Sequence, residues 1–400
     1  MTDERAPRVL LVLPDLQHGG MQTRFLTLAR ECERRGHRVT VAAGPGPLEA
    51  RFGACADMVR LEAVLEGASR HDVAVVSLDP SNVHLLGGLA TAGRLHICIH
   101  NAPGTFDGWF RPSTLERLRP LLAALHASGR VSLSAPSERQ ARFHEEDLDL
   151  PPGTIEAWPN GVEVTGDGRA GSGPVRSVGV VTRLSAEKEP VVRAGAELVA
   201  AGRELGREVA LDIYGSGPDE QMFRDLVEAA LPQGAWRFHG AVDEPLGRED
   251  SAQVLVAAGR ASLEGLVSGR RVVAACWLRH PRGHVGPAVT VGNFTDVAAL
   301  SFSWGRNEPL AATEVWRDLE AMSDADVEAV RDLARASYSA DAMCDRLSQI
   351  IAPTAGGDGD ALALARGLAA DARALESELS EVRAIADQLW VDLEWLRGAT

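Results

Sequence analysis

Lysine is almost missing from this sequence. Of its 41 basic residues, one is lysine, Lys188, and all the others are arginine. Lysine carries a compact ammonium on a flexible stem, whereas arginine carries a planar fork of donors, so the two differ where the geometry of charge matters. Lys188 is therefore either a position where arginine does not suit or an accident of composition, and composition alone leaves both interpretations open.

Other absences exclude whole classes of protein. The longest apolar runs, such as residues 9–14, are strand-sized, whereas a membrane span needs roughly 18 residues or more. No signal-peptide pattern opens the chain, and its five cysteines are scattered without metal-ligand spacing. A net charge of −15 makes nucleic acid and anionic membranes poor partners. We expect a cytoplasmic protein with no transmembrane segment, no metal site and no cofactor.

The length and the alternation of patterns predict two α/β domains. A chain of 400 residues is too long for one ordinary core. Short apolar runs alternate with helical patterns over residues 1–165 and again over residues 175–352, and a Gly-rich segment at 165–174 is the predicted linker. The fold class is therefore two facing Rossmann-like, doubly wound domains. The predicted strands are residues 8–14, 38–43, 73–77, 95–100, 130–135, 154–158, 175–182, 209–214, 235–240, 253–256 and 271–276.

The last segment, residues 360–398, has a different pattern. Leucine, alanine and valine recur at alternating spacings of three and four, flanked by charged residues. This heptad pattern predicts a coiled coil with a second copy or another partner, and the alternative is one amphipathic helix folded back on its own domain.

Two features of the first domain suggest a ligand site. Gly19 and Gly20 lie between the first strand and a helix, where backbone N–H groups can approach an anion or a sugar. His100 ends a predicted strand, so it faces the edge where such folds bind ligands. A plain turn and a structural histidine are the alternatives.

Three loops of the second domain follow predicted strands. Arg183 and Lys188 place two cations where a loop enters a helix, an arrangement suited to a diphosphate. The alternative is a solvated loop in which Glu187 pairs with Lys188. In the second loop, Tyr214 precedes two glycines, Gly215 and Gly217, which suit close approach to a nucleotide or simply make a turn.

The third loop precedes a predicted helix and contains Gly259. Glu264 lies in that helix, where a carboxylate can accept hydrogen bonds from a ribose diol. Its alternative role is complementing the helix dipole.

Together these segments resemble the GT-B glycosyltransferases of the family-4 type. The similar stretches are VLLVLPDLQHGG, RRGHRVTV, WPNGVEV, VGVVTRLSAEK and LDIYGSGP, in the family's order, and the resemblance covers roughly residues 8–350. It implies retaining transfer of a hexose from a nucleotide-diphosphate sugar, with UDP favoured, and a last helix that returns to the first domain.

The resemblance also implies roles for single residues. Arg183 and Lys188 would hold the donor diphosphate, and Glu264 would bind ribose. Gly19 and Gly20 would lie against the donor phosphate and sugar, with His100 near the transferred sugar. The remaining donor-binding residues would be Tyr214, Gly215, Gly217 and Gly259.

One departure from the family pattern concerns the donor sugar. The family has a first glutamate eight positions before the second, and Val256 occupies that position here. This departure favours one alternative, a non-catalytic sugar-nucleotide-binding subunit that docks a partner through its coiled coil. A sugar-nucleotide epimerase of the same fold is the other alternative. The acceptor cannot be identified, although Phe106, Trp109 and Phe110 form an aromatic group in the first domain, and residues 283–294 have no derived role.

Overall fold

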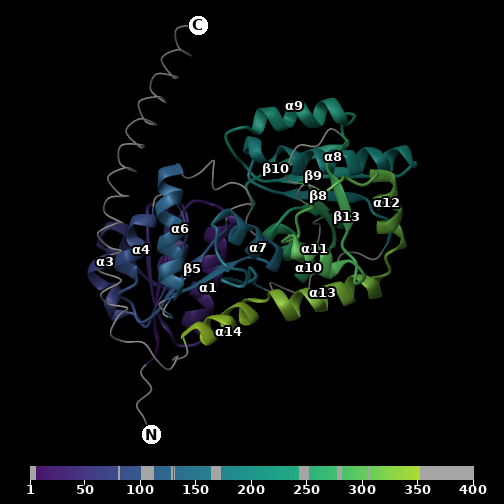
Figure 1. Cartoon of the computed structure of the whole chain (residues 1–400). Helices are drawn as coiled ribbons and strands as arrows, with labels where there is room; N and C mark the ends of the chain where they lie inside the picture. The colour runs from purple at the N-terminus through teal and green to yellow at the C-terminus, as the bar shows by residue number, and fades with distance from the viewer. Residues whose placement is uncertain are drawn as a thin grey trace. The chain divides into compact units, whose positions relative to one another are not determined.

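The chain forms two compact units, which Figure 1 shows in a computed structural model. Unit 1 comprises Met1–Trp158 and Cys344–Thr400, and unit 2 comprises Pro159–Met343. The predicted coiled coil at 360–398 and most of the predicted linker at 165–174 lie outside the described residues. The structure describes residues 6–79, 82–100, 112–127, 129, 131–163, 173–242, 252–276, 282–304 and 307–351.

Unit 1 is built on a seven-stranded parallel sheet in the order β3-β2-β1-β4-β5-β6-β7. Most of its strands are continuous apolar runs because both faces of a parallel sheet are covered. All five residues of β4, for example, are buried. The strands are β1 (Arg8–Val12), β2 (Arg38–Ala43), β3 (Asp57–Arg60), β4 (Val73–Ser77), β5 (Leu95–Cys98), β6 (Val131–Ala135) and β7 (Ile155–Ala157).

Helices connect these strands, and the first of them shows why the sequence is helical here. α1 (Gly20–Arg34) buries Phe25, Leu28 and Cys32, which lie on one face at helical spacing. The chain leaves this helix through Gly36, whose φ of +81° favours glycine. The other helices of this part are α2 (Glu49–Gly53), α3 (Val64–Gly67), α4 (Leu86–Leu89), α6 (Pro112–Ala127) and α7 (Glu138–Asp147).

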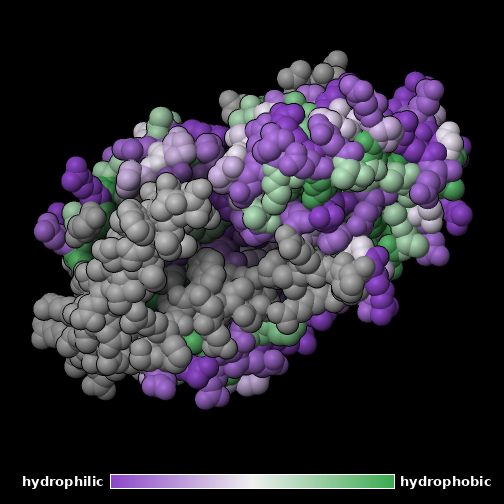
Figure 2. Space-filling view, turned by 90° about the horizontal axis from the view of Figure 1, so that it is seen from above, coloured by the Kyte–Doolittle hydropathy of each residue, from purple (hydrophilic) through white to green (hydrophobic). Residues whose placement is uncertain are grey.

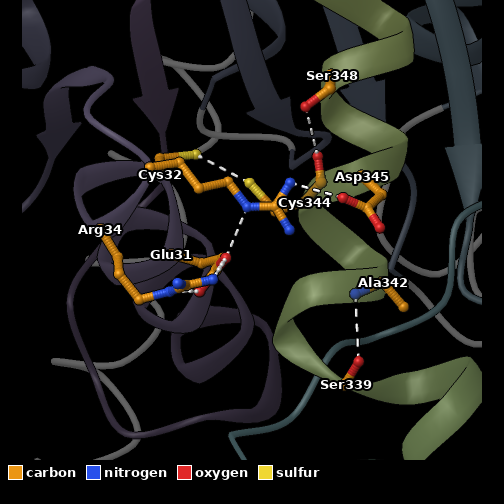
Figure 3. Close-up of polar contacts among 9 residues, drawn as sticks. Glu31, Cys32, Arg34, Ser339, Ala342, Cys344, Asp345 and Ser348 are labelled. Atoms are coloured by element: carbon orange, nitrogen blue, oxygen red, sulfur yellow. Dashed lines mark hydrogen bonds and ion pairs between the residues drawn. The ribbon is translucent and has the colours of Figure 1, made fainter.

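The last described helix, α14 (Ala340–Ile351), joins unit 1 from Cys344 onward. Cys344 of this helix faces Cys32 of α1 (Figure 3), and their sulfur atoms lie 3.8 Å apart. Arg35, the C-cap residue of α1, donates from Nη1 to Asp345 Oδ1 at 2.6 Å. Both cysteines are buried free thiols. A buried thiol pair and an ion pair therefore fix α14 to the first helix of unit 1.

Unit 2 has a six-stranded sheet in the order β10-β9-β8-β11-β12-β13. All its strand pairs are parallel except β12–β13, which is antiparallel. The strands are β8 (Ser177–Val181), β9 (Ala210–Tyr214), β10 (Trp236–Gly240), β11 (Val254–Ala257), β12 (Arg271–Ala275) and β13 (Val285–Ala288).

Apolar clusters cover both faces of this sheet. Successive residues of a strand point to opposite faces, and in β11 Val256 packs with one cluster while Leu255 and Ala257 pack with the other. The first cluster includes residues of α8, α9 and α12, and the second includes residues of α10, α11 and α13. The bounds are α8 (Glu189–Glu204), α9 (Glu220–Ala230), α10 (Arg260–Val267), α11 (Phe294–Ala299), α12 (Ala312–Ala321) and α13 (Asp324–Tyr338).

Two later segments add detail that the sequence did not reveal. Residues 324–351 form two helices, α13 and α14, because Ser339 between them is extended and forms a parallel bridge with Val162. Residues 283–294, which had no derived role, supply β13 and lead into α11. Gly286 is required in that strand, since a Cβ there would lie 2.1 Å from the carbonyl oxygen of Ala274.

The face of the molecule seen in Figure 2 is mainly hydrophilic where it is described, with hydrophobic residues in small groups. In the described part of the chain, no helix is both long and apolar enough to cross a membrane.

Candidate functional site

Each sheet reverses its strand order beside the first strand of its unit. In unit 1 the order turns between β1 and β4, and in unit 2 it turns between β8 and β11. Loops that leave such neighbouring strands turn in opposite directions, and α/β proteins bind ligands in the crevice outside the carboxyl ends there. The loop with Arg183 and Lys188 follows β8, and the segment with Gly259 and Glu264 follows β11. The predicted donor residues of these two loops therefore flank the switch point of unit 2.

The loop after β8 is held by the loop after β9. The backbone N–H of Thr182 donates to the carbonyl of Tyr214 at 3.0 Å, and that of Leu184 donates to Ser216 at 3.0 Å. The N–H of Ala186 donates to the Asp219 carboxylate at 2.8 Å. These bonds fix the backbone on which the two predicted cations stand.

Gly215 and Gly217 make this close packing of loops feasible. A Cβ on Gly215 would lie 1.8 Å from the carbonyl oxygen of Thr182, and the φ of Gly215 is +148°. A Cβ on Gly217 would lie 2.2 Å from the carbonyl oxygen of Leu184. The two glycines thus have a structural role in the turn, and their contact with a nucleotide stays a prediction.

Arg183 is half-exposed and ion-paired within its own loop. Its Nη2 donates to Glu187 Oε1 at 2.6 Å, and its Nε donates to the Ser185 hydroxyl at 3.1 Å. Burial raises the pKa of Glu187, but hydrogen bonds from Ser185 and Arg183 outweigh it and lower that pKa to about 2. Glu187 is therefore an anion at neutral pH that accepts hydrogen bonds from Arg183 and Ser185, and the alternative pairing of Glu187 with Lys188 is not seen.

Lys188 ends a short 3₁₀ turn, η4 (Ala186–Lys188), at the start of α8. The side chain is half-buried, and the described residues offer its ammonium no hydrogen bond or ion pair. Burial lowers the pKa of Lys188, Glu187 opposes this effect, and Arg183 adds to it. The one lysine of the chain thus places a desolvated cation beside a helix N-terminus, which itself favours anions.

Glu264 lies in the second turn of α10, and a neighbouring arginine holds it. Gly259 precedes the helix with a φ of +67°, a conformation that favours glycine. Arg260 Nε donates to Glu264 Oε1 at 2.9 Å, and Glu264 is 35% exposed. No acidic residue lies in the first turn of α10, so the alternative role of Glu264 at the helix N-terminus is wrong. The i, i+4 spacing of arginine and glutamate was the signal that could have identified Arg260.

Tyr214 is buried at the end of β9 and stacks on a residue of the next strand. Its ring lies 4.5 Å from that of His239, with an angle of 10° between the planes. The Asp212 carboxylate lies 2.8 Å from His239 Nε2 and accepts from Arg237 Nε at 2.8 Å. Sequence analysis found Tyr214 but missed this polar group around it, because the group forms only when β9 pairs with β10.

In unit 1, Gly19 and Gly20 begin α1 as the sequence predicted. Gly19 is the N-cap and has extended backbone, and no side chain caps the helix there. The carbonyl of Gly19 accepts from the Thr23 hydroxyl at 2.8 Å, and Gln22 Nε2 donates to Asp15 Oδ1 at 2.8 Å. The backbone N–H groups of this first turn therefore face the switch point of unit 1 without a capping side chain.

His100 follows β5 and lies against a buried arginine. Arg24 is 1% exposed, its Nη1 lies 3.4 Å from both ring nitrogens of His100, and its guanidinium stacks 4.5 Å from the Trp158 ring. Burial, followed by Arg24, His96 and His144, holds the pKa of His100 well below its usual range. His100 is therefore neutral at pH 7. Arg24 was missed because its contact with His100 spans 76 positions of sequence.

The remaining predictions concern the missing glutamate, metal ligands and the aromatic group of the first domain. Val256 is 0% exposed inside β11, so its position offers no polar group to a sugar. The described residues contain no cluster of three metal-ligating side chains. A cavity of about 130 Å³ between α8 and α9, lined by Arg193, Glu197 and apolar residues, includes none of the predicted site residues. The aromatic residues near position 106 lie outside the described residues.

Comparison with known proteins connects this geometry to a family. Residues 18–165 match the family model of Glycosyltransferase Family 4. The structure is similar to a glycosyltransferase from Rickettsia africae, with a TM-score of 0.58 and 15% identity over 86% of this chain and 98% of that one. It is also similar to HepE of Anabaena in complex with UDP and glucose, with a TM-score of 0.58 and 12% identity over 86% and 98% of the chains.

A third similar structure is WaaG, a glycosyltransferase involved in lipopolysaccharide biosynthesis, with a TM-score of 0.56 and 16% identity over 87% of this chain and all of that one (100%). The comparison with curated proteins finds no match. The structural likeness confirms the predicted GT-B fold of two Rossmann-like α/β domains. The match of residues 18–165 to the model of Glycosyltransferase Family 4, together with the structural likeness to glycosyltransferases, supports the predicted transferase activity.

Proposed function

We propose that this chain is a retaining glycosyltransferase that moves a hexose from a UDP-sugar to a hydroxyl acceptor. The observation that carries the proposal is the position of Lys188 at the switch point of unit 2. There a half-buried ammonium without a hydrogen-bonding partner among the described residues stands at the N-terminus of a 16-residue helix. A diphosphate would supply the missing partner.

The diphosphate would draw on two cations and one helix. Lys188 would meet it as a point charge, and the N-terminus of α8 would add its dipole. Arg183 would exchange Glu187 for a phosphate oxygen, a change its half-exposed position permits. We propose that these groups, and no protein-bound metal ion, offset the charge that develops on the leaving diphosphate.

The ribose would bind Glu264. One carboxylate oxygen of Glu264 accepts from Arg260, and no hydrogen bond to the other is found within the described part of the chain. That second oxygen can accept from a ribose hydroxyl. The loop glycines Gly215, Gly217 and Gly259, together with Tyr214, would shape the rest of the nucleotide site.

Unit 1 would contribute hydrogen bonds to the transferred sugar. The uncapped first turn at Gly19 and Gly20 offers backbone N–H groups to a sugar or phosphate oxygen. Because His100 is neutral, it would exchange hydrogen bonds with a sugar hydroxyl and would not act as a cation.

The proposed reaction transfers the sugar on one face. The bond between the anomeric carbon and the diphosphate oxygen breaks, and a bond to the acceptor oxygen forms on the same face. The acceptor proton passes to the leaving diphosphate oxygen, so atoms and charge balance without a protein nucleophile. UDP is the first donor to test, because HepE, which shares the fold, was crystallised with UDP.

A second candidate has one observation in its favour. Val256 is fully buried where the family pattern has a glutamate, so the carboxylate that would meet the donor hexose is missing. A sugar-nucleotide-binding subunit without transferase activity would tolerate this loss. Such a subunit would bind the nucleotide through Lys188 and release no product.

Two measurements separate these proposals. Calorimetric titration with UDP, GDP, ADP and dTDP identifies the nucleotide, and we expect UDP to bind most tightly. UDP release from UDP-sugars then tests catalysis, with Lys188→Ala expected to abolish it and Arg207→Ala to leave it unchanged. Arg207 is a fair control because its exposed pair with Glu320 lies beyond the carboxyl end of α8. Binding without any UDP release would favour the non-catalytic subunit, and no nucleotide binding would refute both.

A further inference from the structure

Arg260 is a buried arginine at the start of α10. It is the first residue of the helix, and its side chain is 9% exposed. Burial lowers the pKa of Arg260, an effect that Glu264 and Glu163 oppose. A buried guanidinium stays charged only when specific contacts stabilise it, and these contacts therefore indicate which groups it positions.

Two donors of the guanidinium point at two different segments of unit 2. Its Nε donates to Glu264 Oε1 at 2.9 Å, and its Nη1 donates to the carbonyl oxygen of Gly161 at 2.5 Å. Because the guanidinium is planar, fixing two of its edges also fixes the direction of the hydrogen bond to Glu264. One oxygen of Glu264 is held, and the other has no hydrogen bond among the described residues.

The Gly161 carbonyl is itself a fixed point. Gly161 stands close to Pro159, where the chain enters unit 2, and its N–H lies 3.3 Å from the sulfur of Met343. A Cβ on Gly161 would lie 2.7 Å from the Cβ of Met343, so the backbones there pack closely. The next residue, Val162, bridges to Ser339. Arg260 is therefore anchored on a turn that other parts of the unit immobilise.

We infer that Arg260 is a positioning residue that orients Glu264 for the ribose of a nucleoside diphosphate, with the Gly161 carbonyl as its anchor. This inference rests on the proposed function. Arg260 acts in two ways: it fixes the carboxylate so that its second oxygen can accept from the ribose diol, and it offsets the negative charge that would otherwise repel a neighbouring diphosphate.

A purely structural role would have a different signature. If Arg260 only joined α10 to the turn at Gly161, its loss would lower the stability of the protein and weaken the binding of every nucleotide alike. If it positions Glu264, its loss weakens the binding of ligands that carry the ribose diol and hardly affects the binding of ligands that lack it. The preference of the protein for UDP over 2′,3′-dideoxy-UDP separates these two roles.

The experiment titrates both ligands by calorimetry into the full chain, its Arg260→Met, Arg260→Lys and Glu264→Gln variants, the Arg260→Met/Glu264→Gln double variant and the control Arg207→Met. The wild type and the control should prefer UDP by about tenfold or more, as lost hydrogen bonds to a charged group predict. Arg260→Met should reduce that preference to about twofold or less, and the double variant should lose no more than Glu264→Gln alone, since residues that act as one unit are not additive.

Arg260→Lys covers the case in which Arg260→Met does not fold. Lysine keeps the charge but has no fork to bridge Glu264 and Gly161, so an intermediate preference is expected. A wild-type preference in either Arg260 variant would overturn the inference while leaving the proposed function intact. If the wild type binds no UDP, the proposed function fails, and the inference fails with it.

Discussion

The close packing of the loops after β8 and β9 predicts how much each glycine to alanine substitution there lowers the free energy of unfolding. Gly215→Ala meets two obstacles, because the φ of Gly215 is +148° and the new Cβ would lie 1.8 Å from the carbonyl oxygen of Thr182. A backbone conformation open only to glycine costs about 1–3 kcal/mol for another residue, and overpacking costs about 1–3 kcal/mol more. The free energy of unfolding should therefore fall by about 4 kcal/mol, the middle of the range that these two costs give.

Two other glycines of unit 2 separate these contributions. Gly234 has a φ of +83° and open space around its Cβ position, so Gly234→Ala tests backbone strain alone. Its expected cost is about 1 kcal/mol. Gly217→Ala tests the contact, because a Cβ there would lie 2.2 Å from the carbonyl oxygen of Leu184. Its cost should fall between those of the other two variants.

Thermal unfolding followed by calorimetry measures the series. For a unit of this size, 1 kcal/mol shifts the midpoint by about 2–4 °C, so Gly215→Ala should lower the transition of unit 2 by about 10 °C and Gly234→Ala by about 3 °C. If Gly215→Ala lowers the midpoint no further than Gly234→Ala does, the loops do not pack as described.

Four further predictions concern the charge and burial of three residues. Glu187→Gln should strengthen UDP binding a few-fold, because it frees Arg183 from its ion pair; unchanged affinity would contradict the exchange. Since the pKa of Glu187 is depressed to about 2, its stabilising effect is full above about pH 4.3 and lost as the pH falls toward 2, so the stability difference between wild type and Glu187→Gln should vanish over that window in acid unfolding experiments. By NMR the His100 ring should titrate well below the usual histidine range, because burial and Arg24 lower its pKa, and a signal that titrates in the usual range would contradict its burial against Arg24. Val256→Glu should lower the free energy of unfolding by several kcal/mol, measured in urea, because it buries a carboxylate in the core.

The sequence was a good guide to the fold wherever strands were buried on both faces. Each predicted strand appears in one of the two sheets, and most of these strands are the continuous apolar runs that a covered parallel sheet requires. β3 was missed because it is short and largely exposed. β13 was missed because its sequence, VGPA, contains a glycine and a proline, which usually signal a turn.

The site was predicted less completely, since strand ends and glycine turns are local features and charge pairing is not. Lys188 and Glu264 fell at the switch point because each follows a recognisable strand. Both Arg183 and Lys188 are near Glu187 in the sequence, and the sequence does not determine which of them forms the ion pair. The contact of Arg24 with His100 needs α1 and β5 in place, so no local pattern reveals it.

Calorimetric titration of UDP into the wild type, Lys188→Ala and Arg207→Ala tests whether Lys188 forms the core of a nucleoside diphosphate site. UDP should bind the wild type and Arg207→Ala alike, and Lys188→Ala should weaken binding by about tenfold or more, because a charge-assisted hydrogen bond is lost. Equal affinity of the three proteins for UDP, or no binding to any of them, would show that Lys188 does not hold a diphosphate.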